Sequence, residues 1–359
     1  QGTATLQGID IVGGALELLW LSRASSRIEL RTLAGAHLRE VALPGIGSTG
    51  GLVGAADQDE AYFQFTSFTT PSKIFRTSIA SGDTELWHEV ELPADTDGFM
   101  VEQVEYPSKD GTPISMFVVH RDDVVLGGNN PTLLTGYGGF GVSLTPTFST
   151  AIVLWLEHGG VWAVPNLRGG GEYGEAWHEA GKRHNKQNVF DDFIGAAQWL
   201  IDNGYTRASK LGIRGGSNGG LLVGAVSTQR PELFGAVICA VPLLDMIRYH
   251  RFGAGPTWTS EYGSADDAAD FRTLFAYSPY HHVEGRAHPP LLMLAADSDD
   301  RVDPMHARKH VAALQHNGDV ALLRIERNAG HGGGDNTAAA VEQGVDVFAF
   351  LFDRLVVPH

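Results

Sequence analysis

The chain has 359 residues, of which 42 are acidic and 26 basic, so its formal net charge at pH 7 is −16. This acidic balance disfavours nucleic acid as a partner, and no stretch of the sequence is long and apolar enough to cross a bilayer. The length allows a complete catalytic domain together with a second, smaller unit.

Residues 1–92 contain short segments whose alternation of apolar and polar side chains predicts antiparallel strands. The expected strands are residues 16–21, 27–32, 61–65, 73–78 and 85–91. Turn signals such as Gly13-Gly14 and Gly50-Gly51 separate them. These strands are too few to close a barrel, so we expect them to be part of a larger β-structure.

From about residue 100 the pattern changes to alternating strands and helices. Strands are expected at residues 114–120, 132–135, 161–165, 211–214, 236–240, 290–295 and 321–325. Helices are expected at residues 188–203, 218–229, 304–317 and 337–355. This alternation predicts an α/β fold with an open, mostly parallel, doubly wound sheet that carries helices on both faces.

The segment Gly215-Gly216-Ser217-Asn218-Gly219 fits the G-x-S-x-G turn that raises a nucleophilic serine above an α/β sheet. The sequence places Ser217 between an apolar strand and a helix of small residues, which disfavours the alternative of a flexible glycine-rich loop. Free N–H groups at the helix start would point toward a reacting carbonyl, so the Asn218 N–H is the first candidate oxyanion donor.

Cys239, the only cysteine, lies in the apolar run at residues 235–241. We expect a buried structural thiol there rather than a nucleophile, and a single cysteine excludes an internal disulfide. This fits a reducing compartment, and a cytoplasmic location is expected, with a periplasmic or secreted location as the alternative.

An acidic loop and a histidine follow Ser217 in the chain order typical of α/β-hydrolases. His331 lies in a glycine-rich loop after an expected strand, where it can serve as the general base. The carboxylate that orients it could be Asp297, Asp299 or Asp300, and composition does not choose between them. Each of these segments follows the carboxyl end of a strand, so we expect them to converge at one edge of the sheet.

Several motifs together make the chain resemble the prolyl oligopeptidase family of serine peptidases. The matching segments are Gly136-Tyr137-Gly138-Gly139-Phe140, residues 166–174, residues 215–220, Trp258 with Glu261-Tyr262-Gly263, Asp299-Asp300-Arg301-Val302 and Ala329-Gly330-His331. The similarity is dense from about residue 101 onward, and the earlier residues match the last part of that family's β-propeller. The resemblance implies an α/β-hydrolase domain at residues 93–359, preceded by a partial β-propeller at residues 1–92.

The resemblance also implies roles for individual residues. Ser217 would be the nucleophile, His331 the base and Asp299 the orienting acid. The Tyr137 hydroxyl would be a second oxyanion donor beside the Asn218 N–H, since a phenol can point its O–H at developing charge from a rigid ring.

The substrate pocket implied by the resemblance is apolar and aromatic. Trp258 would stack on a proline ring of the substrate, Phe140 and Tyr262 would form further walls together with Val302, and Arg301 would donate to a peptide carbonyl. Flat aromatic faces favour a compact apolar ring over a charged side chain.

The implied activity is cleavage of short peptides on the carboxyl side of proline through an acyl-enzyme intermediate, without a cofactor or metal. A complete family member would carry a whole propeller, so we expect the missing N-terminal and propeller part of the same protein as a further partner. No membrane partner is expected.

Three alternatives stay open at this point. A related peptidase of the same family with another preference would need acidic residues near the pocket, and Glu261 is the nearest candidate. An esterase or lipase would share the three catalytic residues, but the Tyr137 and Arg301 segments disfavour it. A non-catalytic binding protein on a hydrolase scaffold is the third alternative, although such proteins usually lose one of the three residues.

Overall fold

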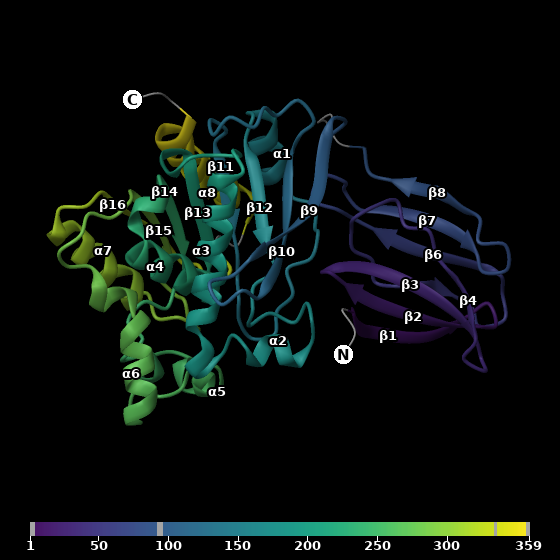
Figure 1. Ribbon diagram of the computed structural model, residues 1–359, viewed down its shortest axis with the longest axis horizontal. Helices are drawn as coiled ribbons and strands as arrows, with labels where there is room; N and C mark the ends of the chain where they lie inside the picture. The colour runs from purple at the N-terminus through teal and green to yellow at the C-terminus, as the bar shows by residue number, and fades with distance from the viewer. Residues whose placement is uncertain (1–3, 92–95, 334–335, 357–359) are drawn as a thin grey trace.

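The computed structural model describes residues 4–91, 96–333 and 336–356 (Figure 1). Two small antiparallel sheets lie beside a larger α/β unit, as Figure 1 shows. The boundary expected between residues 92 and 93 lies outside the described residues, so the division into two domains stays a prediction.

The two small sheets come from the first part of the chain, and each has four strands in sequential order. The first contains β1 (Ala4–Val12), β2 (Ala15–Ser22), β3 (Ser25–Thr32) and β4 (His37–Glu40), and the second contains β5 (Val53–Gly54), β6 (Glu60–Phe65), β7 (Lys73–Ser78) and β8 (Thr84–Glu89). One apolar cluster joins them and includes Val12, Ile28, Leu30, Phe63 and Phe65. Paired four-stranded sheets of this kind are the expected blades of a partial β-propeller.

The large sheet has eight strands in the order β16-β15-β14-β13-β11-β12-β10-β9. They are β9 (Phe99–Pro107), β10 (Pro113–Arg121), β11 (Thr132–Thr135), β12 (Val161–Pro165), β13 (Leu211–Gly216), β14 (Ala236–Ala240), β15 (Leu291–Ala296) and β16 (Ala321–Glu326). The pairs β9–β10 and β10–β12 are antiparallel, and the six strands β11 to β16 run parallel. The predicted α/β-hydrolase fold with a mostly parallel sheet is therefore confirmed.

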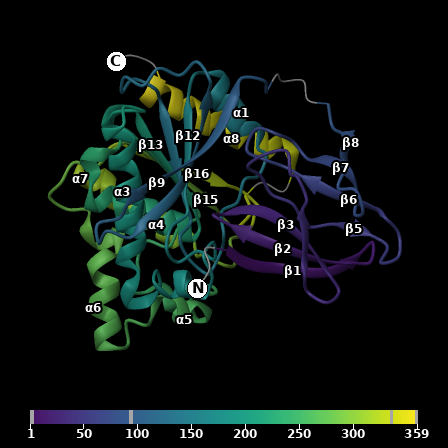
Figure 2. The ribbon, with the colours of Figure 1, turned by 45° about the vertical axis from the view of Figure 1, so that its right-hand side comes forward.

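Helices cover both faces of this sheet (Figures 1 and 2). The helices are α1 (Thr150–Glu157), α2 (Glu175–Glu179), α3 (Gln187–Asp202), α4 (Asn218–Gln229), α5 (Thr259–Tyr262), α6 (Ala268–Tyr277), α7 (Met305–Asn317) and α8 (Thr337–Leu351). One apolar cluster contains residues of α3, α4 and α7, and another contains residues of α1 and α8. On the second face Trp155 of α1 packs against Phe348 of α8 with ring centroids 6.4 Å apart.

The small sheets contact the large one at β9 and β10. Arg23 forms an ion pair with Glu105 at 3.1 Å, and its carbonyl accepts from the Gln103 side chain at 2.6 Å. Phe68 packs edge-on against Phe117 with ring centroids 5.4 Å apart. No helix within residues 4–91, 96–333 and 336–356 is long and apolar enough to span a membrane.

Candidate active site

Ser217 occupies the sharp turn between β13 and α4. Its backbone has φ +58° and ψ −118°, a combination that costs an L-residue roughly 1–3 kcal/mol and is kept only where the surroundings enforce it. Part of that enforcement is the Ser217 N–H, which donates to the Ala240 carbonyl of β14 at 2.9 Å. The turn therefore projects the side chain beyond the carboxyl edge of the sheet.

Two glycines beside Ser217 allow this turn because nothing larger fits. A Cβ on Gly215 would lie 2.0 Å from the Gly219 carbonyl oxygen, and a Cβ on Gly220 would lie 2.6 Å from the Pro242 side chain. Either contact is far inside van der Waals distance, so glycine at position 215 allows β13 to approach α4, and glycine at position 220 allows α4 to approach the segment after β14.

Ser217, His331 and Asp299 form a continuous hydrogen-bonded chain. The Ser217 Oγ lies 3.0 Å from His331 Nε2, and His331 Nδ1 lies 2.7 Å from Asp299 Oδ2. Since a carboxylate only accepts, His331 carries its proton on Nδ1 and leaves the Nε2 lone pair for the serine hydroxyl. This is the tautomer that a general base needs.

The geometry selects one carboxylate from the three that the sequence offered. Asp299 has a side chain only 1% exposed, and its second oxygen accepts from the backbone N–H groups of Arg301 at 3.0 Å and Val302 at 2.9 Å. Asp297 instead accepts from the Asn328 backbone at 2.8 Å, and Asp300 is exposed. Only Asp299 of these three therefore contacts the histidine.

Tyr137 and Asn218 are tied to each other by a hydrogen bond. The Asn218 side-chain amide donates to the Tyr137 carbonyl, and its oxygen accepts from the Tyr262 hydroxyl at 2.8 Å. Burial raises the pKa of Tyr137, although a hydrogen bond with Ser217 and the charge of Arg301 oppose this rise. The Tyr137 phenol thus stays protonated at neutral pH and can donate.

The residues expected to line the substrate pocket lie near this turn. Phe140, 37% exposed, meets the Tyr262 ring edge-on with centroids 5.6 Å apart. Trp258 is partly buried and immediately precedes α5, which carries Tyr262. Val302 is buried beside Asp299, and Arg301 is exposed on the same loop. Of the three aromatic side chains, Phe140 and Tyr262 are in direct ring contact.

Glu261 is the acidic residue nearest to these aromatic side chains, but its carboxylate faces away from solvent. It is 3% exposed. One oxygen accepts from the Phe140 N–H at 3.0 Å and lies 3.7 Å from the Lys186 ammonium, while the other lies 2.8 Å from His178 Nε2. Its charge is therefore engaged by protein groups and does not provide a partner for a basic substrate side chain.

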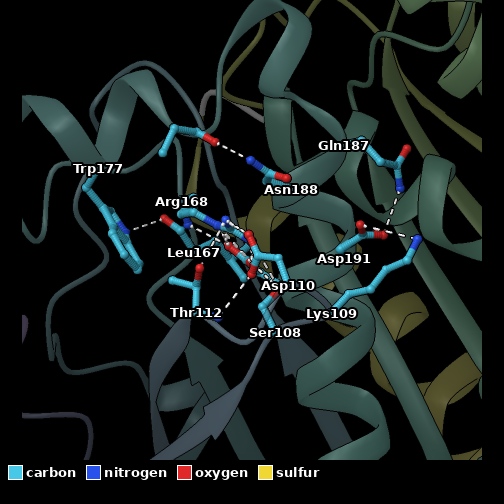
Figure 3. Close-up of polar contacts among 12 residues, drawn as sticks. Ser108, Lys109, Asp110, Thr112, Leu167, Arg168, Trp177, Gln187, Asn188 and Asp191 are labelled. Carbon is cyan, nitrogen blue, oxygen red and sulfur yellow. Dashed lines mark hydrogen bonds and ion pairs between the residues drawn. The ribbon is translucent and has the colours of Figure 1, made fainter.

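The loop after β12 carries Arg168, whose polar contacts with Ser108 and Asp110 are shown in Figure 3. The buried Arg168 guanidinium donates to Asp192 at 2.6 Å, to Asp110 at 2.5 Å and to Ser108 at 3.1 Å. The N–H of the next residue, Gly169, donates to the Trp177 carbonyl at 2.9 Å, and the Gly169 carbonyl accepts from the Gly141 N–H at 3.0 Å. The charge-assisted contacts of Arg168 thus fix a loop on which the Gly136–Phe140 segment rests.

One group of side chains has the composition of a cation site. Atoms of Glu175, His178 and Glu179 lie within 4.8 Å of one another. Both ring nitrogens of His178 already face carboxylates, and Glu179 pairs with Lys182. Exposed carboxylates of this kind are satisfied by such pairing without an ion.

Several residues of the site have no motif in the sequence. Lys186 and His178 contribute buried contacts to it, yet they stand far from Ser217 along the chain. A lysine or a histidine in a polar segment carries no local signal that predicts burial. Cys239 was recognisable as buried, and it is fully buried, with burial raising the pKa of its thiol.

Two family models and several curated proteins are similar to this chain. A model of the prolyl oligopeptidase family matches residues 146–356, and a model of the N-terminal β-propeller domain of prolyl oligopeptidases matches residues 2–90. A prolyl endopeptidase of Elizabethkingia miricola is 43% identical over 352 residues, which are 97% of this chain and 50% of that protein. A prolyl endopeptidase of Dictyostelium discoideum is 39% identical and is covered to 44% of its length.

Solved structures of prolyl endopeptidases and prolyl oligopeptidases share the fold of this chain. A structure from a study of two prolyl endopeptidases superposes with a TM-score of 0.94 at 57% identity, covering 100% of this chain and 54% of that one. The apo form of prolyl oligopeptidase B from Galerina marginata has a TM-score of 0.89 at 32% identity, covering 100% of this chain and 52% of that one. The chain therefore spans about half the length of the relatives it matches.

Proposed function

Because this chain belongs to the prolyl oligopeptidase family of serine peptidases, we propose that it hydrolyses short peptides on the carboxyl side of proline. The observation that carries the proposal is the hydrogen-bonded chain from Asp299 through His331 to Ser217. In this proposal residues 1–92 are the last propeller blades, residues 93–359 are the catalytic domain, and the location is cytoplasmic.

The first half of the reaction forms an acyl-enzyme. His331 Nε2 takes the hydroxyl proton as Ser217 Oγ attacks the peptide carbonyl carbon, and Asp299 stabilises the resulting imidazolium. The carbonyl oxygen becomes an oxyanion that accepts from the Tyr137 hydroxyl and the Asn218 N–H. His331 then gives its proton to the leaving amine, and the carbon–nitrogen bond breaks.

The second half releases the product. A water molecule gives a proton to His331 Nε2 and attacks the ester carbonyl, again with Tyr137 and Asn218 as donors to the oxyanion. Collapse of this intermediate returns the proton to Ser217 and frees a peptide that ends in proline. Atoms and charges balance without any further reactant.

Preference for proline is supported by the side chains around Ser217. Phe140, Tyr262 and Trp258 offer aromatic surface, which favours a flat apolar ring. Glu261, the acidic residue that a preference for basic side chains would require, is already paired with Phe140 N–H, His178 and Lys186. Arg301 lies on the exposed side, where it can donate to a carbonyl of the bound peptide.

The test compares two chromogenic peptides that place proline or arginine before the reporter group. We expect turnover of the proline peptide alone and its loss in Ser217→Ala. Faster turnover of the arginine peptide would overturn the proposed preference. Absence of turnover of either peptide by the folded 359-residue chain would overturn the proposed activity and favour the non-catalytic alternative.

A further inference from the structure

A buried lysine lies behind the two groups that we assign as oxyanion donors. Lys186 immediately precedes α3 and is 1% exposed. Burial lowers the pKa of its ammonium to about 8, although the charge of Glu261 opposes this shift. A lysine in such a place is retained only if its polar atoms have firm partners, because an unpaired buried charge is strongly unfavourable.

The partners of the Lys186 ammonium lie on both oxyanion segments. Its Nζ donates to the Gly138 carbonyl at 2.8 Å and to the Asn218 side-chain oxygen at 3.2 Å. Gly138 directly follows Tyr137, and Asn218 directly follows Ser217. One cation thus joins the loop that carries the phenol to the helix start that carries the backbone donor.

The ion pair with Glu261 does not account for these contacts. Glu261 lies 3.7 Å from Nζ, beyond hydrogen-bonding distance, and its oxygens already face the Phe140 N–H and His178. The centroid of the Tyr262 ring lies 5.3 Å from Lys186 Nζ, and the Tyr262 hydroxyl donates to the same Asn218 oxygen. The hydrogen bonds of the lysine therefore go to the oxyanion segments rather than to its counter-charge.

We propose that Lys186 is a positioning residue that holds Tyr137 and Asn218 at the separation needed to bind the oxyanion. This inference rests on the proposed function of the Ser217 site but not on its preference for proline. Oxyanion donors act through preorganisation. A variable separation between the two segments would therefore weaken binding of the transition state more than binding of the substrate.

The test replaces the ammonium by an apolar group of similar length in Lys186→Met. A second variant, Lys186→Met with Glu261→Gln, removes the carboxylate that the first would leave uncompensated. Lys210→Met is the matched control, because Lys210 also donates to a backbone carbonyl, that of Leu355 at 2.9 Å, on a different part of the domain. Thermal unfolding of each 359-residue variant shows whether that variant is folded.

The first readout is the rate at which an alkyl fluorophosphonate modifies Ser217. The serine oxygen forms a bond to phosphorus, the phosphorus–fluorine bond breaks, fluoride leaves and His331 takes the serine proton. A phosphonyl oxygen occupies the oxyanion position in this reaction, so the rate reports on Tyr137 and Asn218 without any need for a proline. The second readout is the affinity for a non-reactive product peptide that ends in proline.

We expect both Lys186 variants to lose on the order of 10- to 100-fold in phosphonylation rate, while product affinity and Lys210→Met change less than about threefold. Equal losses in rate and product affinity, or an unchanged rate in a folded Lys186 variant, would overturn the positioning role. Normal phosphonylation of the unaltered chain without turnover of proline peptides would overturn the proposed substrate and leave the positioning role to be decided by the variants' rates.

Discussion

Replacing Asp299 by asparagine perturbs the site by one atom, and the hydrogen bonds around that residue determine the outcome. Oδ1 accepts from two backbone N–H groups, those of Arg301 and Val302, and Oδ2 faces His331 Nδ1. An asparagine would keep its oxygen toward the two N–H donors, so its NH₂ group would face the histidine. His331 would then accept at Nδ1 and carry its proton on Nε2, where it cannot take the serine proton.

The loss of the correct tautomer in a serine hydrolase of this kind lowers kcat by about 10,000-fold, which corresponds to about 5.4 kcal/mol of transition-state stabilisation. Two backbone donors fix the orientation here, so we expect the full effect rather than partial rescue by rotation of the amide. The assay is kcat on a chromogenic proline peptide, measured beside Asp300→Asn as the matched control and with thermal unfolding of both variants. A folded Asp299→Asn protein that loses less than about tenfold would refute the assigned role of the carboxylate.

Three further outcomes follow from the same structure. Tyr137→Phe should lower kcat by roughly 100- to 1,000-fold with little change in KM, since it removes one of the two oxyanion donors that we propose. Tyr173→Phe, which loses a hydroxyl bonded to Ser115 instead, should retain activity. Trp258→Leu should lower kcat/KM for proline peptides on the order of tenfold, measured against an alanine peptide that gains nothing from a flat ring. Burial raises the pKa of Glu172 from 4.5 to about 7, so the folded chain binds this proton more tightly than the unfolded chain. The free energy of unfolding of the protein, relative to that of Glu172→Gln, should therefore fall by about 3 kcal/mol as the pH rises from 4.5 to 7. Denaturant unfolding that gives the same relative value at both pH values would contradict the shift.

The parts of the fold that the sequence predicts best are those whose burial leaves a continuous apolar record. The bounds predicted for β11, β12, β14 and α4 coincide with the structure, because these elements lie in the centre of the sheet or pack directly on it. Strand β1 was missed, since Leu6, Ile9 and Ile11 point to solvent and a register shift interrupts its pairing. Helix α6 was also missed, although Asp267 caps its first turn and offered a signal.

The candidate site also contains residues that the sequence predicts and residues that it does not. The turn at Ser217 has a local motif with a physical basis, so residue type and spacing identify it. The carboxylate that meets His331 could not be chosen by composition, because the choice depends on which side chain receives the two backbone N–H groups of its loop. Lys186 and Glu261 contact the site from segments far apart in the sequence, and their pairing exists only in the folded chain.

The central claim, that Ser217 is acylated by a substrate carrying proline, is tested most directly by trapping the intermediate. A peptide ester that ends in proline is mixed with the 359-residue chain. The reaction is quenched in acid within the first turnover, and the protein is mapped by mass spectrometry of its proteolytic fragments. The account predicts an added acyl mass on the fragment that contains Ser217 and none in Ser217→Ala. An unmodified Ser217 fragment during measurable turnover, or an acyl group on another residue, would contradict it.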